Sequence, residues 1–381
     1  MIQLPENFES YADARKAGFL RMKEIKENGG KVVGIFCTFV PTELILAAGA
    51  SPVSLCASSD EPIAAAERDL PRNLCPLIKA SYGFAKTDTC PYFYFSDFIV
   101  GEATCDGKKK MFELMNEIKE TYVMQLPQNR DKAAMKLWIH EMVRFKEKLE
   151  SHYGITITEE DIKKAIDLKN REREAMMDYL SLGKLYPAAI SGYEISSRLD
   201  GLGFTFDTEE KIRVIKERTQ EVIADWEANK KRSESSRPRI LITGCPNSGV
   251  RDKIIKTVEE LGADVVALEC CNGVREKIDP VRQDLPVYEA LAEKYLNINC
   301  SVMSPNTSRI REIESMIDEY RVDGVIEIIL QACHTYSIES HYVKKAVMEK
   351  GKGYLAIETD YSQADKGQIS TRLEAFLETL E

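Results

Sequence analysis

The chain has 381 residues, enough for two or three domains with full cores. Its formal net charge of −10 argues against nucleic acid as a main partner, because phosphate binding needs a basic face. Apolar residues make up 44% of the chain, and no run approaches the roughly 20 apolar residues of a membrane span, so we expect a globular protein outside the membrane.

The first 130 residues are expected to form an α/β domain in which helices alternate with strands. Such alternation is typical of a parallel, doubly wound sheet. Helices are expected over residues 7–29 and 41–50, and strands over 31–36, 52–55, 93–95 and 121–125. The strand at 93–95 rests on Tyr92 to Phe95, a run of aromatic residues with high strand propensity.

A helical segment and linker are predicted for residues 131–235, and a second α/β domain is predicted for residues 236–381. Thr158 to Asp161 resembles a capping box at the start of a helix. Helices are expected within 131–180 and over 208–231, a linker over 230–239, and strands over 240–243, 264–268, 296–299, 324–330 and 353–357. The predicted fold is therefore α/β, with two Rossmann-like doubly wound parallel-sheet domains and a helical segment between or beside them.

The cysteine content is high for the compartment we expect. The N-terminus lacks the basic start and apolar core of a signal peptide, so we expect a cytoplasmic protein, in which disulfides are rare. No two cysteines form a CxxC pair, so zinc ribbons and ferredoxin-type sites are not indicated. Any metal site must be assembled from distant positions. The ten cysteines lie at positions 37, 56, 75, 90, 105, 245, 270, 271, 300 and 333.

Two of these cysteines stand directly before predicted helices. Cys75 precedes Pro76, and proline favours the first helical position, so Cys75 is expected near the N-cap. Cys105 precedes Asp106 and a second helical run. The positive end of a helix lowers the pKa of a thiol and favours the thiolate, which is the form that binds metal.

Other cysteines follow predicted strands. In an open α/β sheet, ligands bind at the carboxyl ends of the strands. Two such edges facing each other would supply six or seven thiolates, a number that favours an iron–sulfur cluster over zinc. The adjacent side chains of Cys270 and Cys271 diverge, so only one is expected in the site, and Cys56 and Cys90 are assigned to core packing. The expected ligands are Cys245, Cys271, Cys300 and Cys333 in the second domain and Cys37, Cys75 and Cys105 in the first.

A dinucleotide site in the second domain is an alternative interpretation. Residues 242–249 lie between a strand and a helix, and Glu269 ends the next strand, where such folds place a ribose-binding acid. The pattern is GxxxxG instead of GxGxxG, and Pro246 removes a backbone N–H that would face a phosphate.

Several motifs resemble the 2-hydroxyacyl-CoA dehydratase and benzoyl-CoA reductase superfamily. They are CTFVPTEL at 37–44, LCP at 74–76, GEATCDGKKKM at 101–111 and ETDY at 358–361. The resemblance covers nearly the whole chain. It implies a [4Fe–4S] cluster between two α/β domains, on cysteines that correspond here to Cys75, Cys105 and Cys333.

The additional cysteines resemble the double-cubane branch of this superfamily, in which six cysteines of one chain hold an [8Fe–9S] cluster. The resemblance assigns five ligands to Cys75, Cys105, Cys271, Cys300 and Cys333, and the sixth is Cys245 or Cys37. It also implies a homodimer, reduced by a separate ATP-hydrolysing iron–sulfur activator, that passes low-potential electrons to a small-molecule substrate.

His334 and Glu102 are the candidate catalytic residues. His334 follows Cys333, and a histidine titrates near neutrality, so it is a candidate proton donor; a solvent-facing histidine at a helix start is the alternative. The run of lysines at 108–110 is interpreted as a solvated helix face, and a docking surface for an acidic activator is the alternative. Two other functions remain open, a [4Fe–4S] subunit of a 2-hydroxyacyl-CoA dehydratase and a non-catalytic iron–sulfur electron-storage protein.

Overall fold

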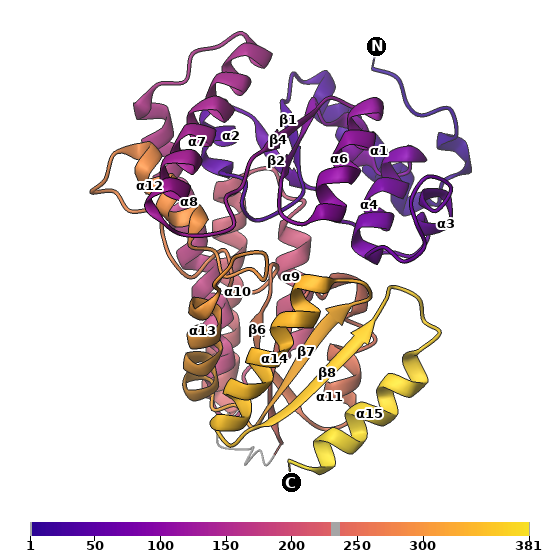
Figure 1. Ribbon diagram of the computed structural model, residues 1–381, viewed down its shortest axis with the longest axis vertical. Coiled ribbons are helices and arrows are strands. Elements are labelled where there is room, and N and C mark those ends of the chain that lie inside the picture. Colours follow the sequence, from indigo (N-terminus) through magenta and orange to yellow (C-terminus); the bar gives the residue numbers. More distant parts are fainter. Residues whose placement is uncertain (1, 230–236, 381) are drawn as a thin grey trace. The chain divides into compact units, whose positions relative to one another are not determined.

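The computed structural model describes residues 2–229 and 237–380, and these divide into two compact units. The first unit contains residues up to 169 and 281–298, and the second contains residues 170–280 and 299 onward. Each unit is built on a sheet of four parallel strands flanked by helices (Figure 1). This confirms the predicted α/β class with two Rossmann-like sheets. Most of the predicted 230–239 linker lies outside the described residues.

The sheet of the first unit has the order β2-β1-β3-β4. The central pair is in register from Val33 opposite Phe98 to Ile35 opposite Val100. The strands are β1 (Val32–Ile35), β2 (Ser51–Ser54), β3 (Phe98–Glu102) and β4 (Thr121–Met124). The helices before the long segment are η1 (Phe8–Ser10), α1 (Asp13–Glu27), α2 (Thr42–Ala47), α3 (Ile63–Ala66), α4 (Pro76–Lys86), α5 (Pro91–Phe95) and α6 (Asp106–Ile118).

Two predicted elements of this unit differ from the structure. The aromatic run expected as a strand at 93–95 is the short helix α5. Pro91 occupies its first turn, and the thiol of Cys90 caps it by accepting from the Phe93 N–H at 3.4 Å. The strand lies further along, in β3, whose residues are all buried and which we did not predict. Strand propensity depends on context, and here local capping and the burial of β3 outweigh it.

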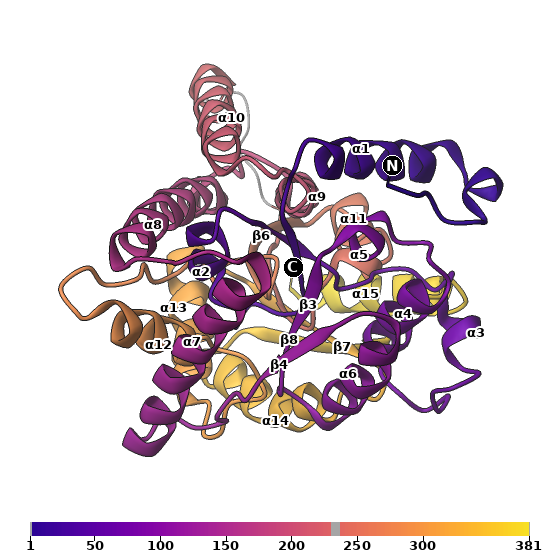
Figure 2. The same cartoon turned by 90° about the horizontal axis from the view of Figure 1, so that it is seen from above.

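The long helical segment begins with α7 (Lys132–Tyr153) and α8 (Glu159–Ser181). The predicted capping box at α8 is confirmed, because the Thr158 N–H donates to Asp161 Oδ2 at 2.9 Å and the Asp161 N–H donates to Thr158 Oγ1 at 3.2 Å. The segment continues with η2 (Leu182–Lys184), α9 (Gly192–Leu202) and α10 (Thr208–Asn229). The helix α12 (Val287–Leu296), which comes later in the chain, packs against α7 (Figure 2).

The sheet of the second unit has the equivalent order β6-β5-β7-β8. Helices α13 and α14 contact each other and α14 packs against β7 and β8 (Figure 1), whereas α11 packs against β6, α9 and α15. The strands are β5 (Arg239–Gly244), β6 (Asp264–Glu269), β7 (Gly324–Leu330) and β8 (Gly353–Thr359). The helices are η4 (Ser248–Val250), α11 (Ile255–Glu260), α13 (Thr307–Glu319), α14 (His334–Glu349) and α15 (Lys366–Glu378).

The strand expected at 296–299 is absent from the described structure, because α12 continues to Leu296 and no strand follows it. Cys300 therefore lies in a loop, and Cys333 follows the third strand of this sheet instead of the fourth. In both units, the second strand of the chain pairs with one side of the first strand, and the third strand pairs with its other side. The direction in which strands are added to the sheet therefore reverses beside the first strand. Ligands of doubly wound sheets bind at the carboxyl ends of the strands at this switch point.

Candidate functional site: cysteines at the two switch points

Cys245 stands at the switch point of the second unit, immediately after β5. Gly244 ends this strand with a φ of +105°, a conformation that L side chains rarely adopt. A Cβ at this position would lie 2.2 Å from the carbonyl oxygen of Ile328. The Cys245 N–H then donates to the same oxygen at 2.8 Å. The glycine thus allows the chain to turn tightly and fixes Cys245 beside β7.

Cys333 lies next to Cys245. It is the N-cap residue of α14, and its N–H donates to the Leu330 carbonyl at 3.0 Å. The Leu330 N–H in turn donates to the sulfur of Cys245 at 3.3 Å. The pKa of the Cys333 thiol is lowered, chiefly by a hydrogen bond with Cys245 that outweighs the opposing effect of burial. The structure thus pairs two predicted ligands at the ends of adjacent central strands and favours the thiolate of one.

Cys271 and Cys300 are linked through Arg275 and Tyr336. Arg275 Nη1 donates to the sulfur of Cys271 at 3.4 Å and also to the Tyr336 hydroxyl. That hydroxyl lies 4.0 Å from the sulfur of Cys300. Tyr336 is in the first turn of α14, the helix that Cys333 caps. Burial raises the pKa of the Cys300 thiol, while the positive charge of Arg275 acts in the opposite direction.

Cys270 and Cys271 point in different directions, as their adjacent positions suggested. The sulfur of Cys270 accepts from Asn247 Nδ2 at 3.4 Å and donates to Asn272 Oδ1 at 3.0 Å. Burial raises the pKa of the Cys270 thiol to about 12. Cys270 is therefore held as a neutral thiol in a polar cluster, and Cys271 is the member of the pair that meets Arg275.

A buried charge network that we did not predict lies behind these cysteines. Arg275 donates to Glu269 Oε1 through both Nε at 3.0 Å and Nη2 at 2.9 Å. Arg309 Nε donates to Glu269 Oε2 at 3.1 Å, and Thr243 Oγ1 donates to the same oxygen at 2.5 Å. Both oxygens of Glu269 are thus bonded within the protein, and its side chain is buried. This arrangement contradicts the alternative in which Glu269 accepts from a ribose.

In the first unit, Cys75 and Cys105 are the N-cap residues of α4 and α6, as predicted. The two helices contact each other. At the start of α6, a Cβ on Gly107 would meet Leu74 Cδ1 at 3.0 Å and Ile78 Cδ1 at 2.8 Å. Both helix N-termini are therefore close together, and each presents a cysteine at its positive end.

Lys108 is buried, so the solvated face we predicted for this lysine is wrong, although Lys110 of the same run is exposed. Its Nζ donates to the Phe36 carbonyl at 2.9 Å, and the Cys56 thiol donates to the same oxygen at 2.5 Å. Burial works to lower the Lys108 pKa, but Cys37, Cys56, Glu102 and Cys105 together raise it. The chain thus places a buried cation among three cysteines and a carboxylate, a feature that the surface-like sequence KKK concealed.

Glu102 ends β3 at the switch point of the first unit and is 0% exposed. Neither carboxylate oxygen has a hydrogen-bond partner. Burial raises the Glu102 pKa to about 7, against the lowering effects of the Lys108 charge and of the backbone N–H groups of Glu102 and Val40, which lie near without forming hydrogen bonds. The hydroxyl of Thr38, in the loop after β1, is also buried without a partner. Glu102 is therefore a carboxyl that holds a proton close to neutral pH.

The other predicted residues lie at less specialised positions. His334 is exposed on the first turn of α14. Cys90 caps α5, and burial raises the pKa of its thiol, as expected for a packing residue. Across residues 2–229 and 237–380, no three His, Cys, Asp or Glu side chains form a group suited to a single metal ion. None of the described helices is long and apolar enough to span a membrane.

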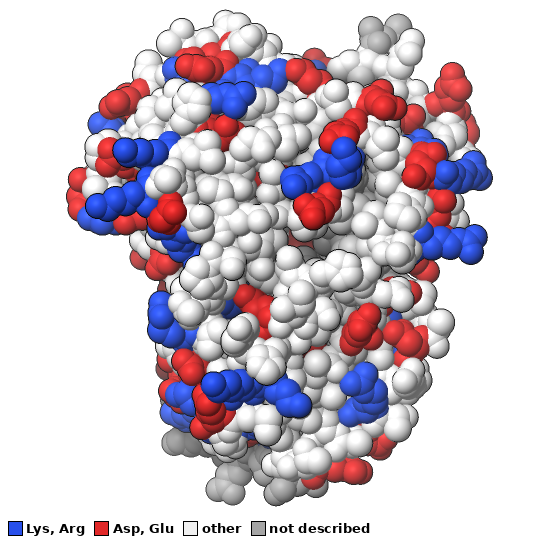
Figure 3. Space-filling view, viewed as in Figure 1, with Lys and Arg blue, Asp and Glu red and all other residues white. Residues whose placement is uncertain are grey.

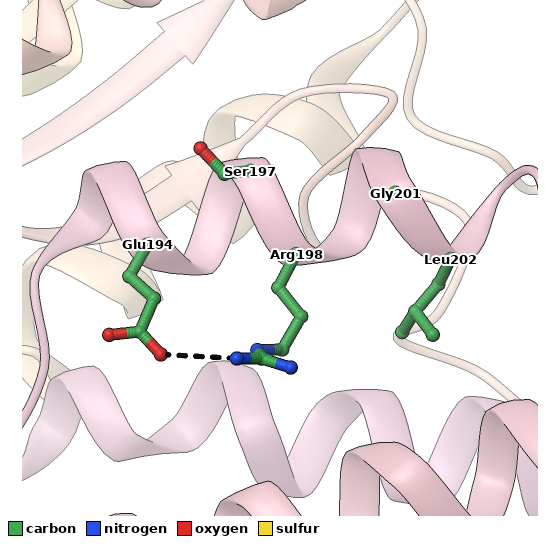
Figure 4. A pocket seen from close by; sticks show the side chains of 5 residues that line it. All are labelled: Glu194, Ser197, Arg198, Gly201 and Leu202. Carbon is green, nitrogen blue, oxygen red and sulfur yellow. Dashed lines mark ion pairs between the residues drawn. The ribbon is translucent and has the colours of Figure 1, made fainter. Parts of the chain in front are cut away.

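A surface recess lies apart from these cysteines. A shallow recess runs along α9 (Figure 4), where Glu194 pairs with Arg198 at 3.7 Å beside Ser197, Gly201 and Leu202. None of the predicted site residues lines it. On the face seen in Figure 3, acidic and basic side chains are interspersed without an extended basic area, in agreement with the net charge of −10.

Comparison with known proteins gives a consistent set of relatives. Residues 37–380 match the family model described as the 2-hydroxyglutaryl-CoA dehydratase D-component. A provisionally named dehydratase subunit of Escherichia coli K12, YjiM, is 50% identical and covers 99% of this chain and 98% of its own. The (R)-phenyllactyl-CoA dehydratase beta subunit of Clostridium sporogenes is 27% identical over 94% of both chains. The (R)-2-hydroxyglutaryl-CoA dehydratase subunit beta of Acidaminococcus fermentans is 23% identical over 99% of both.

Proposed function

Because this chain belongs to the 2-hydroxyglutaryl-CoA dehydratase D-component family, in the 2-hydroxyacyl-CoA dehydratase superfamily, we propose that it is an iron–sulfur reductase with a double-cubane [8Fe–9S] cluster. The observation that carries the proposal is the set of four cysteines around the switch point of the second unit. A single [4Fe–4S] cluster of the dehydratase type uses only Cys333 of these four. Cys245, Cys271 and Cys300 are then left as thiols with no assigned role.

The donor set fits such a cluster. Iron–sulfur clusters are held by thiolates, and cations or N–H donors near the sulfurs stabilise the negative charge. In the second unit, Cys333 is biased toward the thiolate and Cys271 accepts from Arg275. In the first unit, Cys75 and Cys105 stand at helix N-termini. As the family resemblance implies, we propose that Cys75, Cys105 and Cys333 hold one cubane, and that Cys271, Cys300 and a sixth cysteine hold the other.

We assign the sixth ligand to Cys245 in preference to Cys37. Cys245 contacts Cys333 and shares the switch point with it, so its sulfur is already beside a predicted ligand. Cys37 instead lies in the electrostatic environment of Lys108, with Cys56 and Cys105. Replacing Cys245 by Ala is expected to lower the iron content, whereas Cys37→Ala retains it. The opposite result would transfer the assignment to Cys37.

When bound, the cluster would supply low-potential electrons, and the chain's own residues would handle protons. Glu102 is the favoured donor, because it is buried, has no competing hydrogen bond and holds its proton near neutral pH. His334 is a second candidate, from the exposed first turn of α14. The proposal includes an ATP-hydrolysing iron–sulfur activator as electron donor, a small-molecule substrate and a homodimeric assembly.

A [4Fe–4S] dehydratase subunit is the second candidate, and the relatives named as dehydratase beta subunits favour it. Iron and sulfide analysis of protein purified without oxygen separates the two. About eight irons per chain are expected for the double cubane, whereas about four would support the dehydratase subunit. No iron after anaerobic reconstitution would contradict both. Cys90→Ala serves as the matched control and is expected to keep the full iron content.

A third alternative is an electron-storage protein that binds the cluster without turning over a substrate. It is tested by supplying the activator, ATP and a low-potential donor together with small unsaturated or multiply bonded molecules. Sustained product formation excludes storage alone. A protein that accepts electrons but forms no product with any of these molecules would favour storage.

A further inference from the structure

The charge network behind Cys271 and Cys300 contains two arginines whose side chains are both 0% exposed. Arg309 is surrounded by carboxylates. It donates to Glu269, to Glu327 Oε1 at 3.3 Å and to Glu339, and its Nη2 also donates to Thr243 Oγ1 at 2.8 Å. Its positive charge is therefore well matched by acceptors on four elements, which are β5, β6, β7 and α14.

The positive charge of Arg275 is compensated less completely than that of Arg309. Among the described residues, Glu269 is the only carboxylate that Arg275 meets, and it is shared with Arg309. Its Nη2 also donates to the Gly244 carbonyl at 3.2 Å and to the Glu269 carbonyl at 3.3 Å. Its Nη1 points away from these acceptors, to the sulfur of Cys271 and the hydroxyl of Tyr336. One side of a buried cation is thus directed at a sulfur.

Tyr336 extends this arrangement to the next cysteine. Its ring is contacted by both guanidinium groups, with Arg275 at 5.5 Å and Arg309 at 5.0 Å from the ring centroid. Because its oxygen accepts from Arg275, its own O–H proton is directed to a different acceptor, and the sulfur of Cys300 lies 4.0 Å away. Arg275 therefore acts on Cys271 directly and on Cys300 through Tyr336.

A purely structural role explains this poorly. Buried ion networks recover little more than the cost of removing their charges from water, and apolar packing often stabilises as well. A buried cation that donates to a sulfur and a hydroxyl, and not to a second carboxylate, instead suits a neighbouring group that becomes more negative. Added electrons on an iron–sulfur cluster are stabilised by hydrogen bonds to the sulfurs and by nearby positive charge.

We infer that Arg275 is a positioning residue that, directly and through Tyr336, donates hydrogen bonds toward the sulfurs of Cys271 and Cys300 and raises the reduction potential of the cluster that they help to hold. This inference rests on the proposed function. Arg275 and Tyr336, which are not cluster ligands, would thus make the cluster easier for its electron donor to reduce.

The test is an EPR-monitored redox titration of the anaerobic holoprotein, with iron content measured on the same samples. Arg275→Gln removes the charge, and we expect the reduced state to lose about tenfold in stability, which corresponds to a potential about 59 mV lower for one electron. Tyr336→Phe keeps the ring and removes only the hydroxyl, so a smaller shift in the same direction is expected. Arg282→Gln alters an exposed arginine paired with Asp284 and should leave the potential unchanged.

The outcomes separate this inference from the proposed function. If the wild-type protein binds no cluster, both are overturned. If Arg275→Gln keeps its full iron content and the wild-type potential, the inference is overturned while the proposed function stands. If Arg275→Gln loses iron or fails to fold, Tyr336→Phe decides, because a lower potential supports the inference and an unchanged one overturns it. Partial recovery in Arg275→Lys, which retains the charge, would give further support.

Discussion

Replacing Glu102 by Gln should remove a pH dependence from the stability of the first unit. In the folded chain the Glu102 pKa is raised from 4.5 to about 7 because the carboxyl is buried without a hydrogen-bond partner. Below pH 4.5 the folded and unfolded states both hold the proton. Between about 4.5 and 7 only the folded state holds it, so the free energy of unfolding falls as pH rises. Above about 7 both states are ionised and the loss is complete.

The magnitude follows from the pKa difference. At about 1.4 kcal/mol for each pH unit, the change from 4.5 to about 7 amounts to about 3 kcal/mol. The wild-type protein should lose about this much stability between pH 4.5 and 8 through Glu102. The Gln variant has no proton to release, so its stability relative to wild type should rise by about 3 kcal/mol over the same range.

Urea unfolding of cluster-free, reduced protein measures this difference. Trp138 is fully buried in the first unit, whereas Trp226 belongs to the second, so fluorescence in a Trp226→Phe background reports on the first unit alone. Glu113→Gln, at an exposed glutamate on α6, is the matched control and should follow the wild-type pH profile. A stability difference between Glu102→Gln and wild type that stays constant within about 0.5 kcal/mol from pH 5 to 8 would refute the argument.

Three further predictions concern the second unit and the ligand set. Arg309→Gln removes the cation that pairs with Glu327 and Glu339 and leaves Glu269 with Arg275 alone, so thermal unfolding should show a loss of about 3–5 kcal/mol. Gly244→Ala places a Cβ against a backbone oxygen at a positive φ, so we expect the free energy of unfolding to fall by at least about 3 kcal/mol. Gly201→Ala has open space around its Cβ and should be neutral or slightly stabilising. Equal unfolding temperatures for the two variants would contradict this. Cys105→Ala should lose iron while Cys90→Ala retains it, and the reverse pattern in metal analysis would show that the ligand allocation is wrong.

The elements with local signals could be predicted from the amino-acid sequence. Apolar runs predicted the strands at 31–36, 121–125, 264–268, 324–330 and 353–357, and alternation with helices predicted parallel sheets. Pro76 after Cys75 placed an N-cap, and Thr158 with Asp161 placed another, because both features act within one helical turn. The motifs spread over the chain were sufficient to predict the family.

Elements that depend on their neighbours were the ones that the sequence misplaced. The aromatic run at 92–95 forms a helix, since capping by Cys90 and the burial of β3 decide its conformation. Residues 296–299 form no strand, because α12 extends to Leu296 and packs on α7. Strand propensity is an average over many protein environments, whereas the conformation of these two segments is set by their specific neighbours in this fold.

Charge burial was decided by the tertiary structure alone. Lys108 resembles Lys110 in sequence, but α6 turns only the former inward, toward Glu102 and the cysteines. Arg275 and Arg309 lie in segments that carry no motif, and they meet only where β6, α13 and α14 converge on Glu269. The hydrogen-bond partners of these two arginines lie between 4 and 66 residues away in the chain, and no local pattern encodes the distant ones. The fold brings them together because each buried charge must find a counter-charge or a hydrogen bond inside the protein.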